Sequence, residues 1–389
     1  MTRRETGAVE YASRRRVSAG RIAAALVVLA AAGAISALAL GWLEGAPASA
    51  PKLAEVVVPM PPKPAPSKPV TAAIPPPQPA PAPDAAPVPS VAALPPPPAP
   101  PRPDRSTAQP LLPAPDPALV ETGPMGKLPI IGRDGRQPWI AYGRPFDRAD
   151  KRPRVAIVIT GLGPSGDATQ AAIDLPGAVT LAFNPYAKRL GEWVDRARAA
   201  GHEVLLSLPM EPVDYPRQDP GPYTLLTSLT PDENVERLDW VMSRVSGYVG
   251  LTTMMGSRFV ASETNFAPVM AELKKRGLMF VDGRESAQSV AGPLAQRLGV
   301  PCVLADDTID ADTTRDAIDR ELHALEQDAQ RNGAALGVGF AYPLSIERVA
   351  LWAKGLGEQE MVLAPASALA PLPGTPPKAE KSVQKGAAK

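Results

Sequence analysis

The sequence predicts an α/β fold, a single barrel of seven to eight parallel strands with helices packed around it. Short apolar runs alternate with amphipathic stretches of helical period, and this alternation favours parallel strands joined by crossover helices. The alternating region, residues 121–373, is long enough to form one domain with its own core. An open, doubly wound sheet is the alternative, and in both folds chemistry belongs in the loops after the strands.

Each element has a local signal. Residues 155–159 form an apolar, β-branched run that predicts the first strand. In residues 188–200, helical spacing puts Leu190, Trp193 and Val194 on one face. The predicted strands are residues 155–159, 179–183, 203–206, 248–252, 279–282, 303–305, 335–340 and 361–363. The predicted helices are residues 168–175, 188–200, 232–245, 267–276, 290–298, 312–331 and 345–355.

The N-terminal part of the chain predicts a membrane anchor. Residues 22–43 carry no charge, and as a helix rising about 1.5 Å per residue they would span about 33 Å, enough to cross a bilayer core. Residues 1–21 are rich in arginine, which keeps them in the cytoplasm by the positive-inside rule. These features predict a single-pass inner-membrane protein with a periplasmic domain. A signal peptide cleaved after Ala48-Ser49-Ala50 is the alternative.

Proline is concentrated in one segment, because 27 of the 50 prolines lie between Pro47 and Ala118. Proline restricts φ and has no backbone N–H, so residues 44–120 are predicted to form an extended, disordered linker. We interpret this linker as a tether, with binding to an envelope protein as the alternative. Residues 374–389 form a basic tail that is also predicted to be disordered.

Composition excludes several classes of function. The 41 Lys and Arg nearly balance the 40 Asp and Glu, so no overall charge directs the chain to nucleic acid. The single cysteine, Cys302, rules out an intramolecular disulfide. His202 precedes a predicted strand and His323 lies within a predicted helix, so these two histidines cannot form a catalytic zinc site at the strand ends. No zinc or other metal cofactor is therefore expected.

Residues 161–166 have the order G-x-G-x-x-G after a strand and before a helix, the context of a dinucleotide-binding fingerprint. Pro164 lacks an amide that would contact phosphate, and the second strand ends at Asn184-Pro185 without an acid to hold a ribose. Glycines that allow a tight strand-to-helix turn are the favoured interpretation.

Polar side chains follow three of the predicted strands. Glu211 follows the third strand and offers a carboxylate among turn-forming residues. Ser257 and Arg258 follow the fourth strand, and a hydroxyl with a planar donor suits a sugar or a carboxylate. Asp282 and Arg284 end the fifth strand two residues apart, so they project to the same side if the strand continues. They either bind a ligand there or pair with each other.

An acidic cluster follows the sixth strand. Asp306, Asp307, Asp310 and Asp312 lie within seven positions, and oxygen ligands of this kind suit a hard cation. The alternative is that Asp310 or Asp312 caps the following helix.

Taken in order, these loops resemble the divergent polysaccharide deacetylase family, a branch of the (β/α)-barrel carbohydrate deacetylases. The resemblance covers nearly all of residues 152–369. It implies an envelope location and hydrolysis of acetyl groups on a glycan such as peptidoglycan or an exported polysaccharide. The stretches that carry it are Val179-Thr-Leu-Ala-Phe-Asn-Pro-Tyr186, Gly201-His-Glu-Val-Leu-Leu206, Leu208-Pro-Met-Glu-Pro212, Asp219-Pro-Gly-Pro222 with Leu225-Leu226, Gly247-Tyr-Val-Gly250 and Met255-Gly-Ser-Arg258.

This chain departs from the family pattern where the resemblance implies metal ligands. The typical Asp-Asp pair after the first strand is Thr160-Gly161, and typical histidines are replaced by Ser207 and Met254. A late Gly-His-Pro-type block reads Gly339-Phe340-Ala341-Tyr342-Pro343. Without a divalent ion to polarise the acetyl carbonyl and activate water, the family mechanism loses its main source of rate.

The residues and the resemblance together predict glycan binding at a degenerate site, with weak or no hydrolysis. The predicted catalytic residues are Asp282 and Glu211. The predicted substrate-binding residues are Ser257, Arg258, Arg284, Tyr342, Asp307 and Asp310, with Phe340 as a second stacking face beside Tyr342.

Two alternative functions remain open. The first is an active metal-dependent deacetylase whose site is rebuilt from Glu211, Asp282 and the carboxylates of residues 306–312. The second is a structural envelope scaffold, which an apolar strip on the loop face would favour.

Overall fold

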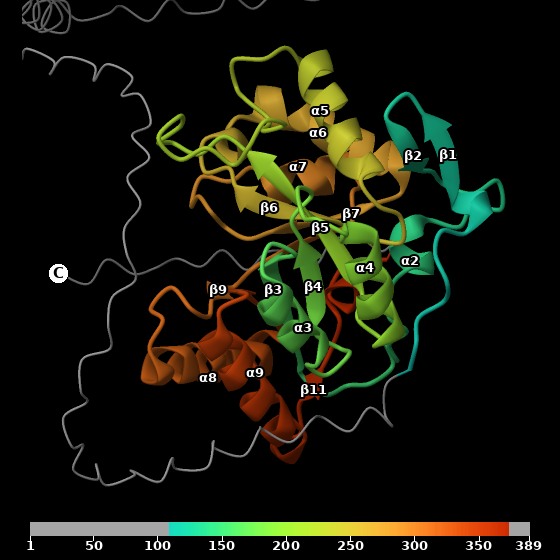
Figure 1. Ribbon diagram of the computed structural model, residues 1–389. Coiled ribbons are helices and arrows are strands. Elements are labelled where there is room, and N and C mark those ends of the chain that lie inside the picture. The colour runs from blue at the N-terminus through green and yellow to red at the C-terminus, as the bar shows by residue number, and fades with distance from the viewer. Residues whose placement is uncertain (1–108, 373–389) are drawn as a thin grey trace, which may run out of the picture. The chain divides into compact units, whose positions relative to one another are not determined.

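The computed structural model describes residues 109–372 (Figure 1). The predicted cytoplasmic segment, membrane helix and basic tail, and the linker up to residue 108, lie outside the described residues. Among the helices of residues 109–372, none is long and apolar enough to cross a membrane.

The core of the described region is one sheet of parallel strands. Their order is β8-β7-β6-β5-β4-β3-β10-β9, and β11 pairs with the start of β3. The strands are β3 (Arg154–Leu162), β4 (Thr180–Phe183), β5 (Val204–Met210), β6 (Gly250–Met255), β7 (Met279–Asp282), β8 (Cys302–Leu304), β9 (Asp307–Thr308), β10 (Ala334–Phe340) and β11 (Val362–Leu363).

The segment from β8 to β9 joins the two edges of this sheet. The Ala305 amide donates to the Asp282 carbonyl of β7 (2.8 Å), and the next amide, Asp306, donates to the Leu336 carbonyl of β10 (2.8 Å). One short segment therefore bonds to strands at both ends of the strand order, and the sheet curls into an α/β barrel. The barrel prediction is confirmed, and the open doubly wound sheet is not observed.

Helices connect the strands and cover the outside of the barrel (Figure 1). The start of α5 has a capping box between Thr230 and Glu233, and α8 ends at Gly333, whose positive φ of 84° stops the helix. The helices are α3 (Gly166–Ile173), α4 (Leu190–Ala199), α5 (Pro231–Ser243), α6 (Glu263–Arg276), α7 (Ala291–Leu298), α8 (Arg315–Asn332) and α9 (Pro343–Gly355).

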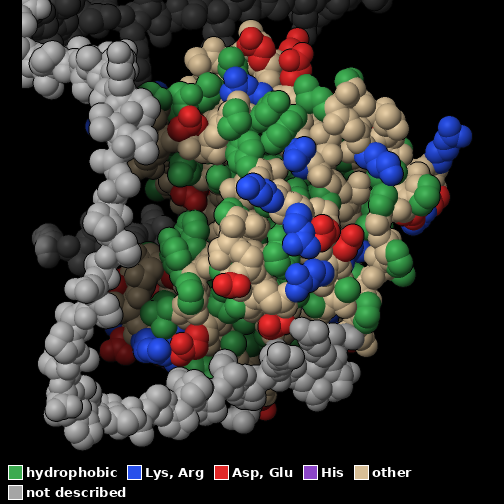
Figure 2. All heavy atoms as spheres, viewed as in Figure 1, with side chains coloured by type: hydrophobic (Ala, Val, Ile, Leu, Met, Phe, Trp, Pro, Cys, Tyr) green, Lys and Arg blue, Asp and Glu red, His purple; other side chains and the backbone are tan. Residues whose placement is uncertain are grey.

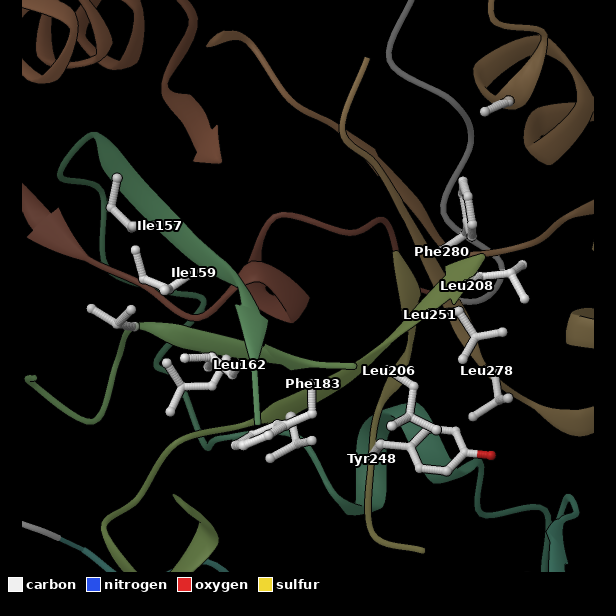
Figure 3. Packing of buried hydrophobic residues seen from close by; sticks show 14 of the residues in the cluster. Ile157, Ile159, Leu162, Phe183, Leu206, Leu208, Tyr248, Leu251, Leu278 and Phe280 are labelled. Carbon is white, nitrogen blue, oxygen red and sulfur yellow. The ribbon is translucent and has the colours of Figure 1, made fainter. Parts of the chain in front are cut away.

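Alternate strand residues form two apolar layers. Ile157 and Ile159 of β3 belong to the larger layer, which packs the strands against the helices (Figure 3). Ala156 and Val158 belong to the inner layer, which fills the barrel. Because successive side chains of a strand point to opposite faces, a strand buried on both faces is apolar throughout. This is why the apolar runs of the sequence predicted the strands so closely.

The amino end of the barrel is closed by elements that the sequence did not predict. These are η2 (Pro117–Leu119), β1 (Val120–Gly123), β2 (Gly126–Pro129) and α2 (Pro138–Ala141), which lie together at one side of the domain (Figure 1). Leu119, Trp139 and Tyr142 are buried in the inner layer. We call this closed end the floor of the barrel. Contacts with the barrel begin before the predicted boundary at residue 121, since the Leu111 amide donates to the Arg198 carbonyl (3.0 Å).

One predicted loop is part of a strand. The stretch Leu208-Pro209-Met210 continues β5, and each of its residues is in register with β6 up to Met255. Pro209 has no amide to donate, but its carbonyl accepts from the Leu225 amide (2.9 Å). The β4 pairing ends at Leu206, so Pro209 lies beyond it, where the strand tolerates a residue without an N–H, and Leu225 satisfies the Pro209 carbonyl.

Charges are mixed on the molecular surface. On the face shown in Figure 2, Lys and Arg side chains alternate with Asp and Glu, and no large field of one sign forms. The mixed charges on this face agree with the nearly equal numbers of basic and acidic residues in the sequence.

Candidate functional site

The carboxyl ends of the parallel strands meet at one end of the barrel, which we call the mouth. Register places Thr160 of β3 beside Phe340 of β10, and Ser207 of β5 beside Thr252 of β6. In barrels of this kind the loops after the strands form the active site. The residues predicted for the site can therefore be located around this rim.

Glu211 follows β5 and is buried. Its Oε2 accepts from the Thr227 amide (2.5 Å) and the Thr227 hydroxyl (2.7 Å), and its Oε1 lies 3.4 Å from Nη1 of Arg258. The carboxylate therefore ties together the loops after β5 and β6. In this arrangement the Glu211 side chain holds the two loops in place.

Ser257 and Arg258 brace the same loop. The Ser257 hydroxyl accepts from the Val213 amide (3.1 Å), and Nη2 of Arg258 donates to the Val213 carbonyl (2.9 Å). The Glu211 carbonyl accepts from the Arg258 amide (3.1 Å). The structure thus brings together three predicted site residues, and their mutual contacts shape the rim. The Arg258 side chain is half exposed, so part of its guanidinium remains open to a ligand.

Asp282 ends β7 and is almost fully buried. Its Oδ1 accepts from the Arg284 amide (2.9 Å), and its Oδ2 accepts from the Ser289 hydroxyl (2.7 Å). Arg284 itself has a left-handed φ of 58°, an uncommon conformation for a residue with a side chain. Asp282 therefore fixes the turn that presents Arg284 to the rim, and the two side chains form no ion pair with each other.

A hollow of 280 Å³ lies beside this turn. Its polar walls come from Arg284, Asp306, Asp307 and Thr308. Burial raises the pKa of Asp306, although a hydrogen bond from the Leu336 amide (2.8 Å) opposes that rise. The hollow offers hydrogen-bond donors and acceptors within a small volume. Two of the residues that line it, Arg284 and Asp307, were predicted from the sequence to bind substrate.

Asp310 is separated from the hollow. Its Oδ2 accepts from the Phe340 amide (2.7 Å) and the Ser345 hydroxyl (2.6 Å), so the side chain joins β10 to the start of α9. Its Oδ1 is buried without a hydrogen-bond partner among the described residues. Burial raises the pKa of this carboxyl. The N-cap residue of α8 is Thr314. The alternative interpretation, that Asp310 or Asp312 caps this helix, is therefore wrong.

Two aromatic side chains stand exposed on the rim. Phe340 is 40% exposed and Tyr342 is 46% exposed, with ring centroids 5.8 Å apart. Val213 in the loop after β5 and Met255 at the end of β6 are also exposed. The sequence predicted the aromatic pair but not Val213 and Met255, because a single apolar residue in a loop or at a strand end carries no signal of its own exposure.

The glycine motif and His202 have structural roles. Gly161 and Gly163 have positive φ of 75° and 110°, and the Gly163 amide donates to the Thr169 hydroxyl (2.8 Å). This supports a tight turn rather than a phosphate cradle. The His202 ring is buried, with its nitrogens 2.7 Å and 3.0 Å from the carbonyls of Val179 and Ile173.

The family described as divergent polysaccharide deacetylase matches residues 157–370. The chain belongs to this family. The protein YibQ of Escherichia coli, itself described as uncharacterized, is 26% identical over 193 residues, which are 50% of this chain and 60% of YibQ. An uncharacterized protein of Haemophilus influenzae is 25% identical over 193 residues, or 68% of its length. A crystal structure of an uncharacterized protein from Agrobacterium tumefaciens is 40% identical, with a TM-score of 0.61 over 63% of this chain and 99% of that one.

The end of β3 at the mouth offers neither a carboxylate nor an imidazole as a metal ligand. The Thr160 hydroxyl donates to the Gly339 carbonyl (3.2 Å), and Gly161 has no side chain. Within residues 109–372, no group of three or more His, Cys, Asp or Glu side chains is placed to hold a metal ion. The acidic cluster of residues 306–312 is dispersed because Asp306 and Asp310 bond to different parts of β10.

Proposed function

We propose that this divergent polysaccharide deacetylase family member recognises an envelope glycan at its barrel mouth, with weak or no deacetylase activity. The glycan is peptidoglycan or an exported polysaccharide. Residues 22–43 anchor the chain in the inner membrane, and the barrel lies in the periplasm. The observation that carries this proposal is the exposed pair of Phe340 and Tyr342, which stands beside the end of β3 where Thr160-Gly161 replace the family's typical acids.

The chemistry of the rim supports a sugar ligand. Exposed aromatic faces stack on apolar faces of a ligand, and a sugar ring presents such a face between its hydroxyls. The neighbouring hollow of 280 Å³ adds the guanidinium of Arg284 and the oxygens of Asp306, Asp307 and Thr308. These groups can donate to and accept from hydroxyl and amide groups. A few polar groups beside an apolar surface are typical of small-ligand sites.

The contacts of the two predicted catalytic carboxylates support weak or absent hydrolysis. Glu211 accepts two hydrogen bonds from Thr227, and Asp282 accepts from Arg284 and Ser289. A general base must lie within reach of the proton that it removes, and both carboxylates are buried beneath the loops that they hold. Among residues 109–372, no group of three or more His, Cys, Asp or Glu side chains is placed to hold an ion that would activate water. A rebuilt carboxylate site therefore has no support among the described residues.

A structural scaffold is the second candidate, and a specific observation favours it. Val213, Met255, Phe340 and Tyr342 are four exposed apolar side chains on one end of the barrel. An apolar rim of this kind also suits contact with another protein. Retention on peptidoglycan separates a glycan-binding protein from a scaffold, since a scaffold needs no affinity for glycan.

The test compares retention on insoluble peptidoglycan for the intact chain in non-ionic detergent and for Phe340→Ala/Tyr342→Ala. We expect about tenfold weaker retention of the double variant, because each stacked ring contributes on the order of 1 kcal/mol. Leu351→Ala is the matched control, since Leu351 is 47% exposed on α9 and lies outside the rim. Equal retention of all three proteins would overturn glycan recognition at the mouth.

The same preparations test hydrolysis. Elemental mass spectrometry measures bound metal, and acetate release is assayed on acetylated peptidoglycan with and without a chelator. We expect no stoichiometric metal and no acetate release that depends on metal. About one divalent ion per chain, with acetate release abolished by the chelator, would establish the active deacetylase instead.

A further inference from the structure

A second cavity lies at the floor, on the end of the barrel opposite the mouth. Its volume is 630 Å³, more than twice that of the hollow beside Arg284. Its walls come from residues 109–112, from α2 with the loop that follows it, and from residues 367–372. These segments sit at the amino ends of the strands, because the Trp139 amide donates to the Gly277 carbonyl just before β7 (3.1 Å). The cavity is therefore separate from the proposed glycan site.

Most of the cavity wall is apolar. Leu112, Ile140 and Leu372 line it and are exposed, and Phe146 adds an aromatic ring to the lining. Exposed apolar side chains that gather around one hollow mark a binding surface, and a concave apolar wall excludes water from a ligand's apolar part. The volume lies within the range of small-molecule sites.

The polar part of the wall is positively charged. Arg144 and Arg148 line the cavity, and no acidic side chain does. Nη1 of Arg144 donates to the Gly201 carbonyl (2.8 Å), and Arg148 donates to the carbonyls of Ser367 (2.7 Å) and Ala370 (3.0 Å). Neither guanidinium forms an ion pair with a carboxylate of the described residues. The hydrogen bonds of both guanidinium groups go to neutral carbonyls, so neither group is in direct contact with a negative charge.

Other charges near the floor leave it with more positive than negative groups. Arg198 is buried beside the cavity, donates to the Leu112 carbonyl (2.7 Å) and also forms no ion pair among the described residues. Glu203 is a buried carboxylate whose charge attracts both Arg144 and Arg148, so a single negative charge faces three arginines. Burial is the larger effect on Arg144 and Arg148, and it lowers the pKa of both.

We propose that this floor cavity binds an anionic amphiphile. The apolar chain lies against Leu112, Ile140 and Leu372, and a single carboxylate or phosphate group pairs with Arg144 and Arg148. The anion compensates two partly buried charges, and the chain covers apolar surface that is otherwise exposed to water. The proposal is independent of glycan recognition, because the two sites share no residue.

The experiment uses photoactivatable dodecanoate, a fatty acid with a diazirine in its chain, on the intact protein in non-ionic detergent. After irradiation, peptide mass spectrometry maps the labelled residues. We expect label in residues 139–148 and 367–372. Unlabelled dodecanoate and dodecyl phosphate should both compete, whereas dodecanol should not, because dodecanol lacks the anion. Comparing the two anionic competitors identifies the preferred head group.

Variants at Ile140 test the role of charge without disturbing the core, because Ile140 is 50% exposed. Ile140→Asp should reduce labelling at the floor about tenfold, since it puts a negative charge against the apolar chain and into the same cavity as the anionic head group. Ile140→Lys should retain most of the labelling. Leu351→Asp is the matched control, because this residue is 47% exposed on α9 and does not line the cavity.

Three outcomes would overturn the proposal. Label spread over the surface and unchanged in Ile140→Asp would show that the probe does not use the cavity. Competition by dodecanol as strong as that by dodecanoate would show an apolar site without anion recognition. Absence of label at the floor of the intact chain would show that the cavity is closed to such ligands, as it would be if neighbouring residues of the chain filled it.

Discussion

The two ends of the barrel use buried carboxylates in different ways. At the floor, Glu203 is fully buried and accepts four hydrogen bonds, from Thr180, from the amide and hydroxyl of Ser367, and from the Arg144 amide. At the mouth, Glu211 and Asp282 accept bonds from loops whose outer side chains stay exposed. The floor carboxylate locks the C-terminal segment to the barrel. The mouth carboxylates hold loops that present Arg258, Arg284 and the aromatic pair.

This difference indicates which end serves stability and which serves binding. A buried carboxylate with every lone pair engaged is costly to disturb, because its partners lose their acceptor inside the protein. A carboxylate that braces a half-exposed loop can be lost with partial replacement by water. Variants at the two ends should therefore separate loss of folding from loss of ligand binding.

The largest effect is expected at the floor. Glu203→Ala should lower the free energy of unfolding by about 3–5 kcal/mol, because the hydroxyls of Thr180 and Ser367 and the Ser367 amide are left buried without an acceptor. Chemical denaturation of the intact chain measures this loss. Glu192→Ala, at an exposed carboxylate of α4, is the control and should change stability little. A loss below about 1 kcal/mol for Glu203→Ala would contradict the interpretation that the hydrogen bonds of Glu203 at the floor stabilise the fold.

A smaller loss of stability is expected at the mouth. Glu211→Ala should lower the free energy of unfolding by about 1–3 kcal/mol, because the amide and hydroxyl of Thr227 lose their acceptor and the half-exposed Arg258 loses its carboxylate. It should also weaken retention on peptidoglycan, since the loop that carries Arg258 is no longer braced. Denaturation and pull-down on the same sample give both values. A loss equal to that of Glu203→Ala would mean that the two ends do not differ.

The aromatic pair should affect binding alone. Phe340→Ala/Tyr342→Ala removes exposed rings, so the free energy of unfolding should change by less than about 1 kcal/mol while glycan retention falls. Thermal unfolding by circular dichroism checks the first part. If stability fell as far as in Glu203→Ala, the rings would have to be structural.

The smallest effect is a dependence on pH. Burial raises the pKa of Asp310 above its ordinary value of 3.8, so the folded state holds this proton more tightly than the unfolded chain does. The stabilisation from the neutral carboxyl is fully present below pH 3.8 and is lost as pH rises through the raised pKa. Asp310→Asn does not titrate, so its free energy of unfolding should improve relative to the natural protein as pH increases. Denaturation curves between pH 4 and pH 7 provide the measurement, and a constant difference would refute the effect of burial.

Much of the barrel could be predicted from the sequence because its strands are buried on both faces. Residues 279–282 were predicted as a strand and are β7, and the long helix predicted at 312–331 is α8 with a shift of three residues at its start. The spacing of apolar residues shows which faces of an element are buried, so these elements can be predicted without knowing which segments pack against them. The floor elements between residues 117 and 141 escaped prediction because they are short and rich in proline, and only their packing on the barrel explains them.

The candidate site was predicted in part for the same reason. Strand ends are local features, so Glu211, Arg258, Asp282 and Arg284 lie at or after the ends of strands that the sequence predicts. Their hydrogen-bond partners were not predictable, since Thr227 and Ser289 contact them through loops that the sequence does not order. The aspartates of residues 306–312 were predicted as a possible cation site. Once β9 pairs with β10, Asp306 accepts from the Leu336 amide and Asp310 accepts from the Phe340 amide, so their carboxylates are held at different positions along β10.

The sequence by itself determined the alternation of strands and helices, the family, and the residue types available at the end of each strand. The tertiary structure decided which of those residues are engaged by loops, which stay exposed, and that two unpaired arginines meet an apolar cavity at the floor. The physical reason is the distance along the sequence over which each feature is set. The apolar period of a helix or strand depends on residues a few positions apart. Side-chain hydrogen bonds, cavities and the neighbours of a buried charge depend on distant segments that meet only when the barrel forms.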